Sequence, residues 1–311
     1  MNLMSKNSLA WLLLIILALI WGCSFILIKE ALIIFAPDEL GAMRIAFTSI
    51  FLLLVGFKKL KDIRLQKAHL YIVAGLCGNL IPSFLFAFAQ TRLESSVAGV
   101  LNALSPLFSL LIGWGIFKQK MLKLQALGIF LSFIGATCLS VAASGGLGSF
   151  NVYALLVVLA TFCYGMNINF IKHKIKSDDP ILVSVASILL VSPLAWCYLL
   201  FTDVWQQMDG SPQLLVSLGA VVLLAVFSSG LALILFNILL KLTNPVFASM
   251  VTYLMPVVSI SIGVYVGEPF DLLHFGSVLL IAIGVYVVQK SSPLSQKPLT
   301  DKDAEKLGLV D

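Results

Sequence analysis

Long apolar segments alternate with short polar ones along the whole chain. Ten segments of roughly 20 residues carry almost no charged side chain, and each is long enough to cross a bilayer as a helix. The first is followed by further spans, so we expect a retained helix and not a cleaved signal peptide. The predicted spans are residues 8–28, 38–57, 70–90, 96–117, 124–143, 151–171, 181–201, 214–240, 246–266 and 273–289.

The second half of the chain repeats markers of the first half at two offsets. At an offset of 143 the pairs are Trp21 and Tyr164, Gly22 and Gly165, Lys29 and Lys172, and Pro37 and Pro180. At an offset of 150 the pairs are Phe86 and Phe236, Ala98 and Ala248, Pro106 and Pro256, Ser109 and Ser259, and Gly113 and Gly263. Five spans fall in each half, so the second half must enter the bilayer from the opposite side.

The predicted fold is therefore an all-α integral membrane protein with ten transmembrane helices, arranged as two inverted five-helix repeats. Repeats of this kind are typical of transporters. The expected parts are a cytoplasmic N-terminus, two repeats and a polar cytoplasmic tail, at residues 1–7, 8–143, 151–289 and 290–311.

Composition and charge agree with a membrane location and predict an orientation. Hydrophobic residues make up 60% of the chain, charged residues 11%, and the mean hydropathy is +1.04, so a water-soluble surface cannot be covered. With a cytoplasmic N-terminus, most of the 20 Lys and Arg residues fall in cytoplasmic segments. The positive-inside rule then predicts a multi-pass protein of the cell (inner) membrane with both termini cytoplasmic.

The charge pattern and the cysteines argue against a nucleic-acid-binding protein and against a metal site. The basic residues are dispersed over short loops and not interleaved with aromatic side chains on one face, which argues against nucleic-acid binding. All five cysteines lie inside predicted spans without metal-ligand spacing. We therefore expect no metal and no cofactor, and the expected partners are the lipid bilayer and a small-molecule substrate. A monomer and a homodimer both remain open.

Polar residues inside the spans form stripes that are candidates for a binding site. The fourth span carries Asn102, Pro106, Ser109 and Gly113 on one helical face, and the ninth span repeats the spacing with Thr252, Pro256, Ser259 and Gly263. Small residues in such stripes allow helices to pack closely, whereas amides and hydroxyls can line a cavity. We favour cavity lining for Asn102 and Thr252, and we expect Pro106 and Pro256 to be bends that serve as hinges or gates, with a static kink as the alternative.

Other spans add aromatic and amide candidates. Trp21 lies too deep in its span for an interfacial belt, and Tyr164 is its repeat equivalent, so both offer flat surfaces for stacking on an organic solute. Amides and a hydroxyl within spans could orient the same solute or bond a neighbouring helix. The remaining substrate-binding candidates are Ser24, Asn79, Asn167 and Asn237.

Arg44 is the charged side chain that lies clearly inside a predicted span, and its repeat equivalent is Ser187. It could bind a substrate carboxylate in bidentate fashion or act as a structural clamp on backbone carbonyls, and we favour the clamp. No Asp or Glu falls in the interior of a predicted span. Proton coupling therefore has no sequence support, and facilitated diffusion is equally open.

Several of these elements together resemble the EamA-type transporters of the drug/metabolite transporter superfamily. They are Trp21-Gly22-Cys23-Ser24-Phe25, Met43-Arg44, Pro106, Pro256, Gly267-Glu268, Gly276 and Gly284. The resemblance implies a central cavity lined by spans one, three, four, six, eight and nine, and export of amino acids, other metabolites or drugs. One departure is Lys118-Gln119-Lys120, where the family often has a Glu equivalent to Glu268.

These observations predict an exporter or facilitator of small organic metabolites, such as amino acids or related amphiphiles, that works by alternating access around a midplane cavity. An enzyme would need clustered acids or a nucleophile and base, but the three histidines lie in or beside loops. No catalytic residue is predicted. An exchanger of phosphorylated solutes or nucleotide sugars would need several cations in the cavity, and a non-transporting structural or signalling membrane protein is the other alternative.

Overall fold

The computed structural model describes residues 6–118, 121–143, 150–175, 177–207, 210–243, 248 and 251–290. The predicted N-terminal segment 1–7 and tail 290–311 lie outside these residues, apart from Lys6, Asn7 and Lys290. Part of the predicted ninth span, 246–266, also lies outside them.

Helices account for all five spans of the first half. The first span is α1 (Lys6–Ala31), the second is α2 (Pro37–Gly56), and the fifth is α7 (Lys123–Ala142). The third and fourth spans are each built from two helices, α3 (Ala68–Gly75) with α4 (Ile81–Ala89), and α5 (Ser95–Leu101) with α6 (Ser105–Gly115).

The second half follows the same order. Its spans are α8 (Ala154–Lys174), α9 (Pro180–Leu200), α10 (Pro212–Leu223) with α11 (Ala232–Leu242), α13 (Val251–Tyr265) and α14 (Leu272–Lys290). In the described residues, eight helices are long and apolar enough to cross a membrane, and two shorter apolar helices, Val251–Tyr265 and Leu272–Val288, complete ten. The predicted ten-helix membrane fold is confirmed.

Proline and a polar cap residue set where several helices begin. Pro180 and Pro212 occupy the first turn of α9 and α10, where a missing backbone N–H costs nothing. The Asp179 carboxylate accepts hydrogen bonds from the N–H groups of Ile181 (2.9 Å) and Leu182 (3.1 Å). These bonds satisfy amides at the helix start that have no partner within the helix.

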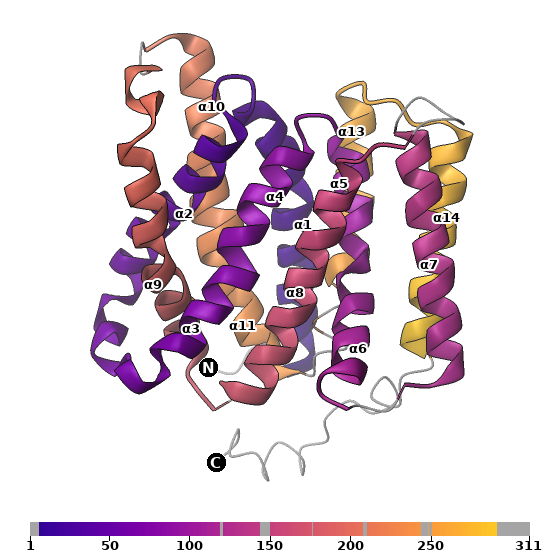
Figure 1. The fold of residues 1–311 in the computed structure, drawn as a ribbon, viewed down its shortest axis with the longest axis horizontal. Helices are drawn as coiled ribbons and strands as arrows, with labels where there is room; N and C mark the ends of the chain where they lie inside the picture. The colour runs from indigo at the N-terminus through magenta and orange to yellow at the C-terminus, as the bar shows by residue number, and fades with distance from the viewer. Residues whose placement is uncertain are drawn as a thin grey trace.

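The helices form a bundle in which equivalent helices of the two halves run in opposite directions (Figure 1). Lys29, near the end of α1, lies on the same side of the bundle as Glu268 and Glu94. Asn151, just before α8 begins, donates to the carbonyl of Arg92 (2.8 Å) on that side. α1 therefore ends on the side where α8 begins, as an inverted repeat requires.

Two ion pairs join the halves on the opposite side of the bundle. Lys67 lies 2.6 Å from Asp178, and Lys59 lies 3.3 Å from Asp179. The Tyr71 hydroxyl also donates to Asp178 at 2.7 Å. Burial of Asp178 would raise its pKa, but the hydrogen bonds from Lys67 and Tyr71 hold that pKa below its usual value.

Two spans contain a π-helical stretch at equivalent places. The third span contains a π-helical stretch at Leu76–Leu80, and the eighth contains one at Leu224–Leu231. A π-helical turn inserts an extra residue, so the faces before and after it no longer follow one stripe. A Cβ built on Gly75 would overlap the carbonyl of Ser187 on α9, so Gly75, just before the first of these stretches, faces α9.

Helices α7 and α14 pack against each other at one edge of the bundle (Figure 1). Glycines allow this contact, because a Cβ built on Gly284 would overlap the Gly128 carbonyl and the Ser132 hydroxyl. Backbones that approach this closely depend on small residues at the crossing point.

We expect Gly284→Ala to lower the midpoint of thermal unfolding in detergent, because the added methyl group costs roughly 1–3 kcal/mol when it overlaps a rigid backbone. Gly276→Ala in the same helix is the matched control, since a Cβ there meets nothing within 4 Å. Alanine favours a helix by about 1 kcal/mol over glycine, so the control should keep or raise the midpoint. Equal midpoints for both variants would contradict the close approach of the helices.

Candidate functional site

A cavity of about 110 Å³ lies in the centre of the bundle, between the two halves. At ~30 Å³ for each water molecule this is room for roughly four waters, somewhat less than the ~150 Å³ of a cavity that holds one benzene ring. The residues that line it come from spans one, three, four, six, eight and nine, as predicted, and additionally from span two through Arg44. The predicted residues brought together here are Trp21, Ser24, Arg44, Asn79, Asn102, Pro106, Tyr164, Asn167 and Thr252.

Two predicted residues do not line this cavity. Asn237 is buried elsewhere, and its amide donates to the hydroxyl of Ser184 on α9 at 2.8 Å. That bond between α11 and α9 is a structural contact, which removes Asn237 from the candidate site. Pro256 is buried within α13 and is also not part of the lining, whereas its repeat equivalent Pro106 is.

Two aromatic pairs that cross between the halves form part of the cavity wall. The ring of Trp21 lies 5.3 Å from that of Phe236, and the ring of Tyr164 stacks 6.1 Å from that of Phe86. Under the repeat, Trp21 corresponds to Tyr164 and Phe236 corresponds to Phe86. The two contacts therefore join equivalent positions of the two halves, although the Trp21–Phe236 rings are tilted by 54° and the Tyr164–Phe86 rings are stacked at 26°. The repeat markers already named all four residues, but sequence reasoning took only Trp21 and Tyr164 as site candidates.

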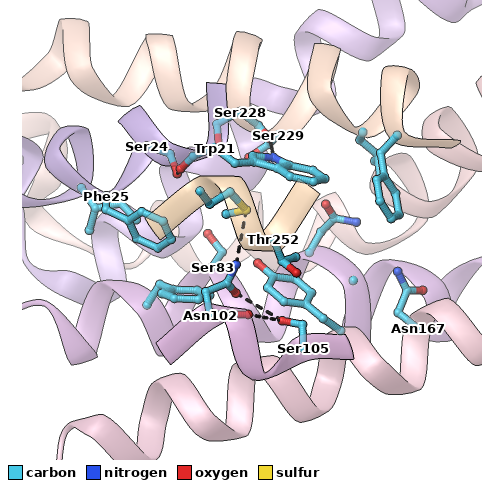
Figure 2. Close-up of a pocket in the computed structure, with 18 of the residues that line it drawn as sticks. Trp21, Ser24, Phe25, Ser83, Asn102, Ser105, Asn167, Ser228, Ser229 and Thr252 are labelled. Carbon is cyan, nitrogen blue, oxygen red and sulfur yellow. Dashed lines mark hydrogen bonds between the residues drawn. The ribbon is translucent and has the colours of Figure 1, made fainter. Parts of the chain in front are cut away.

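The π-helical stretch of the eighth span fixes the position of Trp21. The indole N–H of Trp21 donates to the backbone carbonyl of Ser228 at 2.8 Å. Figure 2 shows Trp21 beside Ser228 and Ser229, with Asn102 and Ser105 opposite them in this view. Because π-helical turns occur frequently at functional sites, the stretch at Leu224–Leu231 is a second sign that this region is specialised.

The amides of the cavity differ in whether they already have a partner. The Asn102 amide N–H donates to the sulfur of Met255 at 3.6 Å, and its Oδ1 accepts from the Ser105 hydroxyl at 3.4 Å. In the described part of the chain, the Asn79 side chain makes no hydrogen bond and the buried Oδ1 of Asn167 has none. Unpaired polar groups at membrane depth are costly. Hydrogen bonds from a bound solute or from water would therefore stabilise the side chains of Asn79 and Asn167.

The hydrogen-bond partners of Ser24 and Arg44 differ from those that the sequence predicts. The Ser24 hydroxyl donates to the carbonyl of Trp21 at 2.6 Å, so it is already occupied by its own helix. Arg44 was expected to clamp backbone carbonyls, but its Nε donates to the Ser229 hydroxyl at 2.7 Å and its Nη2 to the Ser228 hydroxyl at 3.3 Å. Both serines lie next to Gly230 in the π-helical stretch, which no sequence periodicity predicted.

Comparison with protein families shows which family this chain belongs to. The chain matches the EamA-like transporter family over residues 8–141 and again over residues 151–289. The chain belongs to the EamA-like transporter family. Two consecutive matches to one family also agree with the repeat found in the sequence.

The sequences of several related proteins align with nearly the whole of this EamA-like transporter. An "uncharacterized transporter" of Archaeoglobus fulgidus is 25% identical over 89% of this chain and 98% of its own length. The "uncharacterized transporter YyaM" of Bacillus subtilis is 26% identical over 90% of this chain and 93% of its own. The "uncharacterized inner membrane transporter YedA" of Escherichia coli K12 is 24% identical over 93% of this chain and 95% of its own.

A crystal structure shares the fold of the EamA-like transporter with a TM-score of 0.63, at 19% identity over 89% of this chain and 95% of the other. At that identity the likeness concerns the fold alone. Family and relatives together identify a multi-pass membrane transporter.

We expect Asn237→Ala to lower the midpoint of thermal unfolding, because it removes the hydrogen bond to Ser184 at a cost of about 1 kcal/mol and leaves a small void. Asn79→Ala is the matched control, since that amide has no hydrogen-bond partner among the described residues. Its removal should leave the midpoint unchanged or raise it. A larger loss for Asn79→Ala than for Asn237→Ala would show that the cavity amide is structural.

Proposed function

We propose that this protein moves small organic solutes, such as amino acids or related amphiphiles, across the cell membrane as an exporter or facilitator. The observation that carries the proposal is the aromatic cavity between the two halves, which is lined by the half-buried amide of Asn79 and by Asn167, whose buried Oδ1 has no hydrogen-bond partner among the described residues. A structural bundle would gain stability by filling such a cavity with apolar side chains.

The lining suits a solute with an apolar body and a polar end. Trp21, Tyr164 and their aromatic partners offer large apolar surfaces, while Asn79, Asn102 and Asn167 offer amides that can both donate and accept. Thr252 adds a hydroxyl from α13. Small-molecule sites commonly combine a mostly apolar wall with a few polar groups in this way.

Alternating access also requires contacts that can open on one side at a time. On the side predicted to be external, Lys29 pairs with Glu94 and lies 3.2 Å from Glu268. Glu268 additionally accepts hydrogen bonds from the backbone N–H groups of Ser95 (2.8 Å) and Ser96 (2.9 Å). This cluster ties the end of α1 to the start of α5 and to the segment after α13. We propose that it closes the outer side and breaks when that side opens.

The inner side has a different residue at the equivalent position. Lys118 corresponds to Glu268 under the repeat, is exposed, and has a left-handed backbone with φ of 53°. A lysine cannot accept hydrogen bonds from the start of a helix as a carboxylate does. The Glu268 contact therefore has no counterpart at Lys118, and on the inner side the halves are joined instead by the ion pairs of Asp178 and Asp179. Pro106 and the two π-helical stretches are the proposed bends for the motion.

Solute flux in proteoliposomes tests the proposed function. A panel of radiolabelled amino acids, carboxylates and neutral amphiphiles is offered to liposomes with and without protein, under imposed pH gradients of either sign. We expect at least one solute to cross faster with protein, and Asn79→Ala and Asn167→Ala each to reduce that flux at least tenfold.

The control for these variants is Thr137→Ala, because Thr137 is exposed on α7 and its hydroxyl only bonds its own helix, at the carbonyl of Phe133. That variant should transport at the normal rate. Flux equal to protein-free liposomes for the whole panel would end the proposal of transport, and normal flux in both asparagine variants would end the site assignment.

We expect Glu268→Gln to lower the thermal midpoint at pH 7 by the equivalent of about 1–3 kcal/mol, because a buried, hydrogen-bonded charge is lost. Burial would raise the pKa of Glu268, but hydrogen bonds from Ser95 and Ser96 lower it to about 2. A lowered folded-state pKa stabilises the protein above the unfolded value of about 4.3, and the stabilisation is lost as the pH falls toward 2.

The difference between wild type and Glu268→Gln should therefore shrink between pH 5 and pH 3, as measured by thermal unfolding across that range. Glu30→Gln is the control, since Glu30 accepts only one side-chain hydrogen bond, from Gln213 at 3.1 Å. A difference that does not change with pH would contradict the role of the Glu268 charge.

A further inference from the structure

Arg44 brings a positive charge to the cavity without a negative charge to balance it. No Asp or Glu is part of the lining among the described residues, and no ion pair there includes Arg44. Its recorded hydrogen-bond partners are the hydroxyls of Ser228 and Ser229, which carry no charge. A cation at membrane depth is costly unless it is paired, so the site lacks a counter-ion.

The Arg44 guanidinium also has N–H groups that make no hydrogen bond within the described residues. It carries five N–H groups, of which the bonds to Ser229 (from Nε) and Ser228 (from Nη2) use two. The remaining donors belong to the planar fork that matches a carboxylate. The two serines hold the guanidinium at the cavity wall, where Arg44 is part of the lining.

The charge is present in one half of the repeat. Ser187, the equivalent of Arg44, is buried, and its hydroxyl donates to the carbonyl of Ser184 at 3.1 Å within α9. The aromatic pairs of the wall occur in both halves, but the cation occurs once. A symmetric scaffold with one cation selects for a ligand with a charge at one end.

We propose that the solute is an organic monoanion, whose carboxylate pairs with Arg44 and whose apolar body lies against the aromatic pairs. This narrows the proposed function from amino acids and related amphiphiles to carboxylates without an amino group, and it rests on that function for the step of transport. A ligand with a net charge of −1 neutralises the cavity. A zwitterion would leave the Arg44 charge unbalanced, an amine would be repelled, and a phosphorylated solute would bring more negative charge than one guanidinium can match.

Two matched series of ligands test the charge preference directly on purified wild-type protein by titration calorimetry. One series is 3-phenylpropanoate, phenylalanine, 3-phenylpropylamine and the uncharged 3-phenylpropanamide. The other is hexanoate, norleucine, hexylamine and hexanamide. We expect one of the carboxylates to bind at least tenfold more tightly than every other member of its series. The absence of such a preference in both series overturns the proposal.

Variants then assign the preference to Arg44. Arg44→Gln should weaken carboxylate binding at least tenfold and leave the amide unaffected, and Arg44→Lys should retain part of the preference, because it keeps the charge without the fork. Arg92→Gln is the matched control, since Arg92 is exposed outside the cavity. Unchanged carboxylate binding in folded Arg44→Gln overturns the proposal. If that variant does not fold, the wild-type comparison of acid and amide decides.

Flux of the same ligands separates this inference from the proposed function. Carboxylate binding that depends on Arg44, without flux of any ligand, supports the anion site and contradicts transport of these solutes. Flux that is equal for acid, amide and amine supports transport and contradicts the anion site.

Discussion

Lipid offers no hydrogen-bond partner, so every polar group within a span has to be satisfied by the protein or by what the protein binds. This constraint separates structural polar residues from candidate functional ones. Asn169 donates to the Ser109 carbonyl at 2.8 Å, and Asn237 donates to Ser184, so both serve packing between helices. The buried Oδ1 of Asn167 and the charge of Arg44 have no such partner among the described residues, and both residues line the central cavity beside the half-buried Asn79. The buried amide of Gln90, at the end of α4, is also unpaired but lies outside this cavity.

The bundle can keep such a cavity because its edges are packed closely. At the α7 and α14 edge, Gly128 and Gly284 bring two backbones into direct contact. In the centre, aromatic pairs between the halves form part of the wall, and equivalent positions are in contact in the pairs Trp21 with Phe236 and Tyr164 with Phe86. A contact duplicated by the repeat can form with similar energy in both halves, which is what a rocking motion between two states requires.

Span number and helix bounds could be predicted from hydropathy because length and apolarity are sufficient for a transmembrane helix. The predicted span 124–143 is α7 at Lys123–Ala142, and 181–201 is α9 at Pro180–Leu200. Side-chain direction could not be predicted next to the π-helical stretch at Leu76–Leu80, because a π-helical turn changes the helical register. Gly75, which directly precedes this stretch, faces α9. The serine partners of Arg44 could not be predicted either, because Ser228 and Ser229 lie in another π-helical stretch, whose register no periodicity reveals.

Departures from the repeat matter because an inverted repeat on its own gives the inward-facing and outward-facing states similar energies. A contact that one half alone can make stabilises one of those states over the other, since the free-energy difference follows from differential contacts. Glu268 makes such a contact with Ser95 and Ser96, whereas Lys118 at the equivalent position has no carboxylate to offer. Arg44 is a second departure, because its repeat equivalent is the uncharged Ser187. The otherwise symmetric cavity therefore carries a single cation, which we propose orients the bound ligand. We therefore propose that the aromatic pairs take part in the motion that both halves share, and that Glu268 and Arg44 determine the preferred state and the solute.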